Sequence, residues 1–233
     1  MAISAAEGAE APGTADQRRE QMLHAALEVI SARGYADTRI ADVAERAGVS
    51  PALVIYYFKT KDQLLTEAIR YYEDAWYAVG QRRMEGLPSA AARLEEFVAM
   101  SCLADAEPEP ETSGQLWLDF WAQAARNDEV GSVRQKSDER WREIIAALVR
   151  EGQQAGEFRA EVDAASFAIY LSTLLDGLTI QIALNDPVVD SVAAYELSMR
   201  FIADQLGFSW TPGRGREAAQ HRRQTRATPQ KGR

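Results

Sequence analysis

Apolar residues recur along most of this chain at intervals of three and four positions, which is the period of an amphipathic α-helix. No segment alternates apolar and polar residues as a half-buried β-strand does, and no internal repeat is visible. The pattern therefore predicts an all-α fold of about nine helices, separated by Gly- and Pro-containing segments. We expect these helices near residues 16–33, 38–47, 50–58, 60–84, 89–106, 113–126, 129–151, 163–184 and 190–206.

The segment 38–61 predicts two short helices joined by a glycine turn. The first helix carries one apolar stripe, formed by Ile40, Val43, Ala44 and Ala47. Gly48 supplies the positive φ that ends this helix. Ser50 can accept the free N–H groups of the next helix, whose first position suits Pro51 because no N–H is needed there. Two short helices that meet across such a turn form a helix-turn-helix, a motif that places its second helix in the DNA major groove.

The second short helix has a solvent face suited to DNA. Val54 and Phe58 lie one turn apart and are expected to face the core, which leaves Tyr56 on the outer side. Tyrosine hydroxyls donate to phosphates, whereas Ala52 and Leu53 offer only apolar contact, suited to a thymine methyl group. The candidate DNA-contacting residues are Thr38, Arg39, Ser50, Pro51, Ala52, Leu53, Tyr56, Tyr57, Lys59 and Lys61. The alternative is a helical hairpin within a bundle, with the tyrosines as amphipathic cover.

Composition and helix length divide the chain into four segments. Residues 1–15 are mostly Ala, Gly, Glu and Pro without a period, and we expect a disordered tail there. Residues 16–70 are expected to form a small helix-turn-helix DNA-binding domain, and residues 71–210 a larger helical domain for ligand binding and dimerisation. Residues 211–233 predict a disordered basic tail. The capping-box pattern at 60–63 starts a helix that joins the two domains.

The net charge of −9 is unusual for a DNA-binding protein, so its distribution matters. Residues 16–70 contain eight basic and eight acidic residues, whereas residues 71–211 contain eleven basic and twenty-four acidic residues. Residues 212–233 contain seven basic residues and one acidic residue. Phosphate attraction is local and screened within about 10 Å at moderate salt, so a distant acidic body does not prevent a specific contact.

Several other classes of protein are disfavoured. The N-terminus lacks the positive charge and apolar region of a secretory signal, and no apolar run approaches the ~18 residues of a membrane span. Cys102 is the only cysteine and the chain has two histidines, which argues against a disulfide and a Cys/His zinc site. The sequence shows no glycine-rich phosphate loop and no nucleophile motif. We therefore expect a soluble cytoplasmic protein without a metal, a cofactor, catalytic residues or a membrane partner.

Aromatic residues concentrate on the helices of the first half of the larger domain. The five tryptophans favour a pocket for an apolar or cationic small molecule, since ring faces attract cations. The candidate pocket residues are Tyr72, Trp76, Phe97, Met100, Trp117, Phe120, Trp121 and Trp141. Aromatic stripes at helical spacing also form plain core, and this alternative stays open. Asp176 and Gln181 lie on an otherwise apolar helix and need partners if buried, from a ligand or from a second chain.

The last two predicted helices, 163–184 and 190–206, are apolar on more than one side. A helix that is apolar on all sides must be buried on all sides, and a chain this short has few helices to cover both faces. The second face is therefore expected to meet another copy of the molecule, which predicts a homodimer. The candidate interface residues are Phe167, Tyr170, Leu171, Leu174, Leu178, Ile182, Val192, Tyr195 and Phe201.

The run TRIADVAERAGVSPALVIYYFKTKDQLL resembles the DNA-binding region of the tetracycline-repressor (TetR) family. The match covers roughly residues 16–69, and it implies an N-terminal helix-turn-helix followed by a larger all-α domain for dimerisation and ligand binding. The positions that match DNA-contacting residues of the family are Thr38, Ser50, Tyr56, Tyr57 and Lys61. The family usually has an aromatic residue, often one that touches phosphate, where this chain has Ile55. That contact is therefore not carried over.

The segments GQLWLDFWAQAARNDEV, GQQAGEFRAEVD and LLDGLTIQIAL resemble the C-terminal domain of the betaine-pathway repressor subgroup, which implies a homodimer through the last two helices. Motif and resemblance together predict a homodimeric regulator of transcription. We expect a repressor that a small-molecule effector releases from near-palindromic double-stranded operator DNA. Two other classes remain as alternatives: an all-α protein-interaction module whose helix-turn-helix never touches DNA, and an all-α enzyme.

Overall fold

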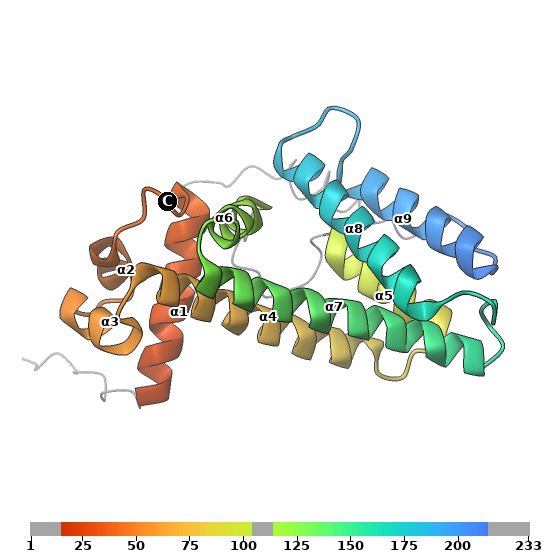
Figure 1. Ribbon diagram of the computed structural model, residues 1–233, viewed down its shortest axis with the longest axis horizontal. Coiled ribbons are helices and arrows are strands. Elements are labelled where there is room, and N and C mark those ends of the chain that lie inside the picture. Colours follow the sequence, from red (N-terminus) through yellow and green to blue (C-terminus); the bar gives the residue numbers. More distant parts are fainter. Residues whose placement is uncertain (1–14, 104–113, 214–233) are drawn as a thin grey trace, which may run out of the picture. The chain divides into compact units, whose positions relative to one another are not determined.

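The computed structural model describes residues 15–103 and 114–213 of the chain, and these residues form nine α-helices without a β-strand (Figure 1). The all-α prediction is confirmed. The helices are α1 (Ala15–Arg33), α2 (Ile40–Arg46), α3 (Pro51–Phe58), α4 (Lys61–Met84), α5 (Ala90–Cys102), α6 (Gly114–Ala124), α7 (Asp128–Gln154), α8 (Ala164–Ala183) and α9 (Ser191–Leu206). The tails predicted for residues 1–15 and 211–233 lie almost entirely outside the described residues.

Contacts between Cα atoms divide the chain after Tyr71 into two compact units. We call the described residues up to Tyr71 the N-terminal unit and those from Tyr72 onward the C-terminal unit. α4 contributes its first turns to the N-terminal unit and its remaining turns to the C-terminal unit. Each unit contains a hydrophobic core of its own.

The N-terminal unit contains the predicted helix-turn-helix. α1 packs on α2 and α2 packs on α3, with Val54 and Phe58 of α3 fully buried. Gly48 has a φ of +64°, which ends α2 as its position predicts. The Ser50 hydroxyl accepts the N–H of Leu53 at 3.2 Å, and Pro51 occupies the first helical position. Cap, turn and buried side chains together confirm the helix-turn-helix.

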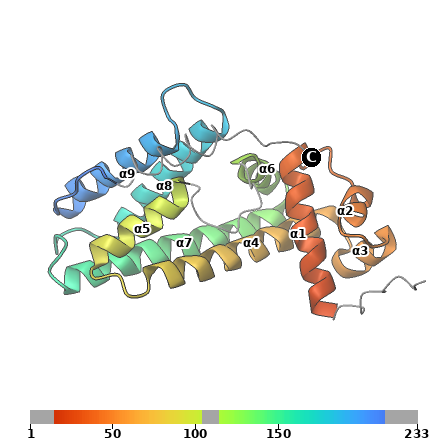
Figure 2. The same ribbon diagram turned by 180° about the vertical axis from the view of Figure 1, so that it is seen from behind.

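The C-terminal unit is built on four helices that share one core. α5 and α8 pack on each other and each packs on both α7 and α9, while α6 packs on α7 and α8 (Figures 1 and 2). Tyr195 lies at the centre of this core, where it is fully buried, and its hydroxyl donates to Glu95 Oε1 at 2.5 Å. Because a buried hydroxyl needs a partner, this bond fixes the position of α9 relative to α5.

The end of α7 differs from the sequence expectation. The sequence predicts this helix over residues 129–151, yet α7 continues through Gly152 to Gln154, and Gly156 with a φ of +72° follows it. A Cβ atom at Gly152 would lie 2.1 Å from the ring of Phe158. Gly152 therefore makes room for a buried aromatic ring inside the helix rather than breaking it.

Within one chain α8 is buried on one side only, so its second apolar face remains available to another copy of the molecule. Its inner side packs on α6, α7 and α9, while Ile169 and Tyr170 are 50% and 65% exposed on its outer side. By length and composition alone Ala164–Ala183 could cross a membrane. The prediction that no apolar segment is long enough for a membrane span is therefore wrong for α8. Core helices of soluble proteins pass the same test, so a single helix of this kind is weak evidence for a membrane span.

Candidate functional site

The outer face of α3 is mainly apolar. Ala52, Ile55 and Tyr56 turn outward, while Leu53, predicted as an apolar reader, is half-buried. Ile55 is 51% exposed and Tyr56 is 78% exposed, although both carry large hydrophobic side chains. The ring of Tyr56 meets the half-buried Tyr57 edge to face, with 5.6 Å between the ring centroids. Tyr56 therefore presents a hydroxyl group beside an exposed aliphatic side chain.

Two predicted DNA-contacting residues have a different role in the structure. Thr38 is 2% exposed, and its hydroxyl donates to Gly34 O at 2.8 Å. The ammonium of Lys61 donates to Tyr35 O at 2.6 Å and to Thr38 O at 2.9 Å, and it lies 4.1 Å from the ring centroid of Tyr35. These side-chain bonds hold the turn between α1 and α2 and so position the helix-turn-helix, while the predicted DNA contacts of Thr38 and Lys61 stay predictions.

Basic side chains flank the two short helices. Arg39 precedes α2 and donates its backbone N–H to a carboxylate oxygen of Asp42 at 2.9 Å. Lys59 follows α3 with a φ of +55°, at a tight turn in which the Thr60 N–H donates to Phe58 O at 2.5 Å. The side chains of Arg39 and Lys59 are exposed, as a phosphate contact requires.

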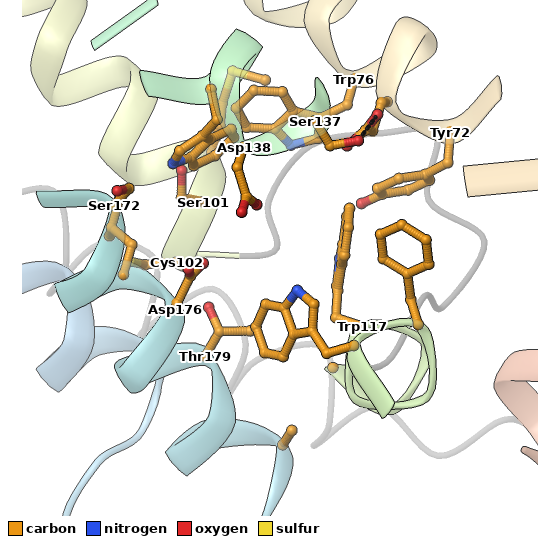
Figure 3. A pocket seen from close by; sticks show the side chains of 18 of the residues that line it. Tyr72, Trp76, Ser101, Cys102, Trp117, Ser137, Asp138, Ser172, Asp176 and Thr179 are labelled. Carbon is orange, nitrogen blue, oxygen red and sulfur yellow. Dashed lines mark hydrogen bonds between the residues drawn. The ribbon is translucent and has the colours of Figure 1, made fainter. Parts of the chain in front are cut away.

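The C-terminal unit contains a cavity of about 340 Å³ lined by α4, α5, α6, α7 and α8 (Figure 3). Seven of the eight predicted pocket residues line it, namely Tyr72, Trp76, Met100, Trp117, Phe120, Trp121 and Trp141. The eighth, Phe97, is buried outside the lining, with its ring centroid 4.6 Å from that of Trp141. Figure 3 shows Tyr72 of α4 pointing into the cavity on one side, with Asp138 of α7 and Asp176 of α8 on the other. The sequence-predicted aromatic residues thus gather around one space.

The aromatic rings of the cavity form two groups. Trp76 and Trp141 lie with their ring centroids 5.1 Å apart. The ring centroid of Trp117 in α6 lies 6.2 Å from that of Tyr72 and 6.5 Å from that of Trp121. Each ring face carries the negative side of the aromatic quadrupole, which attracts a cation within about 6 Å. Two groups of indole and phenol rings around one cavity therefore suit a cationic or apolar molecule.

Charged side chains complete the lining of the cavity. They are Glu73, Arg134, Asp138, Arg142 and Asp176. Arg134 and Asp138 form an ion pair of 3.0 Å along one face of α7, and Glu73 accepts the hydroxyl of Ser137 at 2.9 Å. Both carboxylates are partly buried, and this burial raises the pKa of Glu73 and of Asp138. Aromatic rings thus form the apolar part of the cavity lining, and carboxylates make another part of it acidic.

Asp176 differs from the other two carboxylates. Within residues 15–103 and 114–213, its side chain has neither a hydrogen bond nor an ion pair. Burial raises the pKa of Asp176 to about 6, and the neighbouring Asp138 carboxylate adds to the rise. A half-buried carboxylate that has neither a hydrogen bond nor an ion pair is costly. Asp176 is therefore the acidic group best placed to receive a positive charge.

Sequence reasoning singled out Asp176 but missed the other acidic groups of the cavity. Asp138 lies on the polar half of α7, where acidic residues are usually solvated. The spacing of residues could have placed Asp138 in the cavity. Arg134, Asp138 and Trp141 lie four and three positions apart, so Asp138 shares one face of α7 with the predicted pocket residue Trp141. Glu73 follows Tyr72 directly, so only the fold shows that it faces the same cavity.

Comparison with known proteins identifies the family. Residues 22–68 match the bacterial regulatory proteins of the tetR family, and residues 90–207 match the C-terminal domain of BetI-type transcriptional repressors. The chain belongs to the TetR family. It is 30% identical over 192 residues to the HTH-type transcriptional regulator BetI of Escherichia coli O45:K1 (strain S88 / ExPEC), covering 81% of this chain and 94% of that protein. The BetI of E. coli strain SE11 is 32% identical over 194 residues, with the same coverage.

Solved structures agree with this family. A transcriptional regulator from Saccharomonospora viridis in complex with choline is 28% identical, with a TM-score of 0.72, over 80% of this chain and 96% of that chain. A TetR-family regulator from Rhodococcus sp. is 26% identical, with a TM-score of 0.71, over 82% and 99%. The families and relatives that match are transcriptional regulators and not enzymes. This TetR-family chain is therefore a transcriptional regulator similar to BetI.

The predicted interface residues of this TetR-family chain fall into two groups. Four of them are buried in the core of the C-terminal unit and are corrected to core residues, namely Phe167, Leu171, Leu178 and Tyr195. Tyr170 is exposed, and four are partly exposed, namely Leu174, Ile182, Val192 and Phe201. Ile169, Leu184 and Leu197, which the prediction did not include, are also exposed large hydrophobic residues of the described chain. The face available to a second chain is thus the outer side of α8 and α9, not their inner side.

Proposed function

We propose that this chain is a homodimeric repressor that binds near-palindromic operator DNA through α3 and leaves it when a small cation fills the aromatic cavity. The observation that carries the proposal is the cavity itself, where indole rings surround a space and Asp176, within the described residues, makes neither a hydrogen bond nor an ion pair. A repressor of this kind acts where DNA and metabolites meet, so we place it in the cytoplasm.

The chemistry of the cavity favours a quaternary ammonium ion as the effector. Such an ion cannot donate strong hydrogen bonds and is held instead by ring faces and by a nearby negative charge. Trp76 and Trp141 supply ring faces, and Asp176 supplies a carboxylate that forms no ion pair with any guanidinium of the described residues. The relative from Saccharomonospora viridis, which is 28% identical, was crystallised with choline. Choline is therefore the first ligand to test.

A direct test compares choline with its neutral carbon isostere, 3,3-dimethylbutan-1-ol, by isothermal titration calorimetry. The two molecules have the same shape, so a cation site must prefer choline, and we expect a preference of at least about tenfold. Asp176→Asn should remove most of that preference because it removes the facing charge. Asp204→Asn is the matched control, since Asp204 is an exposed carboxylate of α9 outside the cavity lining. Equal affinity for both molecules would exclude a cation effector.

Contact with DNA is proposed for the outer face of α3 and its flanks. Tyr56 would donate to a phosphate, while Arg39 and Lys59 would add charge at the two ends of the motif. In a dimer, two such helices about 34–36 Å apart would enter successive major grooves of one operator. Thr38 and Lys61 would support this contact indirectly by holding the turn before α2.

Substitution of Tyr56 tests this role. We expect Tyr56→Ala to weaken operator binding by about 1–3 kcal/mol while choline binding is retained. Tyr56→Phe keeps the ring and removes the hydroxyl group, so it should share most of the loss if the hydroxyl donates to phosphate. Fluorescence anisotropy of a labelled operator measures both variants. An unchanged titration for both would remove Tyr56 from the DNA interface.

We propose that α4 couples ligand binding in the cavity to DNA binding. This helix begins in the N-terminal unit and then lines the cavity with Tyr72, Glu73 and Trp76. A ligand shifts an equilibrium only if it binds the two arrangements unequally. A cation that draws Tyr72 and Trp76 toward Asp176 would favour one position of α4. In a dimer it would therefore favour one distance between the two copies of α3.

A further inference from the structure

The outer face of α3 carries an exposed aliphatic residue that the helix does not need for its own stability. Among the described residues of the N-terminal unit, Ile55 and Tyr56 are the exposed large hydrophobic residues. Val54 and Phe58 already anchor the helix in the core. Isoleucine is also a weaker helix former than leucine, because its branched Cβ restricts the side chain. Neither packing nor helix propensity therefore explains an isoleucine at this position.

The composition of α3 limits how it could recognise bases. Pro51–Phe58 contains no Arg, Lys, Asn, Gln, Asp or Glu, so it lacks every side chain that makes paired hydrogen bonds to base edges. Its hydroxyl groups belong to Tyr56 and Tyr57, and Tyr57 is half-buried. The remaining side chains of α3 present apolar surface. In the major groove the only apolar group on a base edge is the C5-methyl of thymine.

We infer that Ile55, together with Ala52, contacts thymine methyl groups, so that each operator half-site carries a thymine where α3 faces the bases. The inference rests on the proposed function, because it presumes that α3 enters the major groove. Ala52 and Ile55 lie three positions apart and therefore share one face of the helix. Tyr56, next to them, turns its hydroxyl to the backbone phosphates. Sequence recognition at this position depends on a methyl group rather than on hydrogen bonds.

The experiment removes methyl groups from DNA and nothing else. A duplex that the full-length protein selects from a random-sequence pool is resynthesised with deoxyuridine in place of each thymine in turn. Deoxyuridine keeps every hydrogen-bonding group, so only lost apolar contact can weaken binding. For the wild-type protein we expect a loss of about fourfold per methyl at one or two positions of each half-site, and no change elsewhere.

Protein variants assign the effect to Ile55. Ile55→Ala should bind thymine and deoxyuridine duplexes equally at the sensitive position, whereas Ile55→Val should keep part of the difference. Because Ile55 is exposed, both variants should fold, and a thermal melt by circular dichroism checks this. Replacing the sensitive T·A pair by 5-methylcytosine·G restores the methyl group, so it should bind more tightly than cytosine·G at that position.

The outcomes separate this inference from the proposed function. If the protein selects a duplex but no deoxyuridine substitution weakens binding, the methyl contact is overturned while DNA binding stands. If Ile55→Ala retains the full sensitivity to deoxyuridine, another residue reads the methyl group and the assignment to Ile55 is overturned. If no duplex is selected at low salt, the proposed DNA binding fails, and the inference fails with it.

Discussion

At the scale of single residues, Asp176 makes ligand binding in the cavity dependent on pH. Its pKa of about 6 lies well above the usual 3.8, because burial disfavours the charged form and Asp138 adds repulsion. Arg134 and Arg142 of α7 oppose the rise, and Glu73 of α4 lines the same cavity. The carboxylate is therefore ionised at pH 7.5 and takes up a proton as the pH falls through 6. A bound cation would hold it ionised to lower pH.

This shift predicts how effector affinity depends on pH. At pH 5, one unit below a pKa of about 6, only about a tenth of the Asp176 side chains are charged. The affinity for choline should therefore fall about tenfold from pH 7.5 to pH 5, with most of the loss below pH 6.5. Calorimetric titrations at several pH values measure this change. Asp176→Asn should give a nearly flat profile, and a wild-type profile equally flat would show that Asp176 does not hold the cation.

The residues also show where sequence reasoning succeeds. The 3.6-residue period placed Val54 and Phe58 in the core and Tyr56 on the surface, and all three positions are confirmed. Periodicity could not show that Thr38 is buried or that Lys61 donates to backbone carbonyls. Both facts depend on the path of the turn between α1 and α2, which the side-chain pattern does not encode.

At the scale of helices, caps were easier to predict than the orientation of an apolar helix. Ser50 and Thr60 each accept a backbone N–H three residues on, as their sequence patterns predict. α8 was harder because apolar residues surround it, so its period does not separate the inner from the outer side. Phe167 and Leu171 face the core, whereas Ile169 and Tyr170, only one or two positions away, are exposed.

The outer side of α8 makes a prediction about assembly. A charge there should oppose the packing of a second apolar face, so we expect Ile169→Glu to convert a dimer into a monomer at micromolar concentration. Light scattering coupled to gel filtration measures the mass. Ala147→Glu is the control, since it adds the same charge to an exposed position of α7. A variant that stays dimeric, or a wild-type protein that is monomeric, would contradict the proposed interface.

At the scale of the whole molecule, charge and function are separated along the chain. The segment with the helix-turn-helix is neutral, while the acidic residues concentrate in the segment that forms the C-terminal unit. Under the proposed function, acidic surface there would weaken non-specific attraction to DNA and leave specific contacts to α3 and its flanks. Seven of the eight predicted pocket residues line one cavity, but which charged groups join them could not be predicted, because those groups come from α4, α7 and α8 together.

The central claim is that a cation in the aromatic cavity releases the operator. The most direct measurement is the anisotropy of a labelled operator duplex, selected from a random pool, titrated with the protein at increasing choline concentration. We expect saturating choline to weaken operator binding by about tenfold or more, within the usual range of coupling between sites. 3,3-Dimethylbutan-1-ol should have little effect, and Asp176→Asn should bind the operator normally without responding to choline. Unchanged operator affinity when choline is bound, or an equal response to the neutral isostere, would contradict the account.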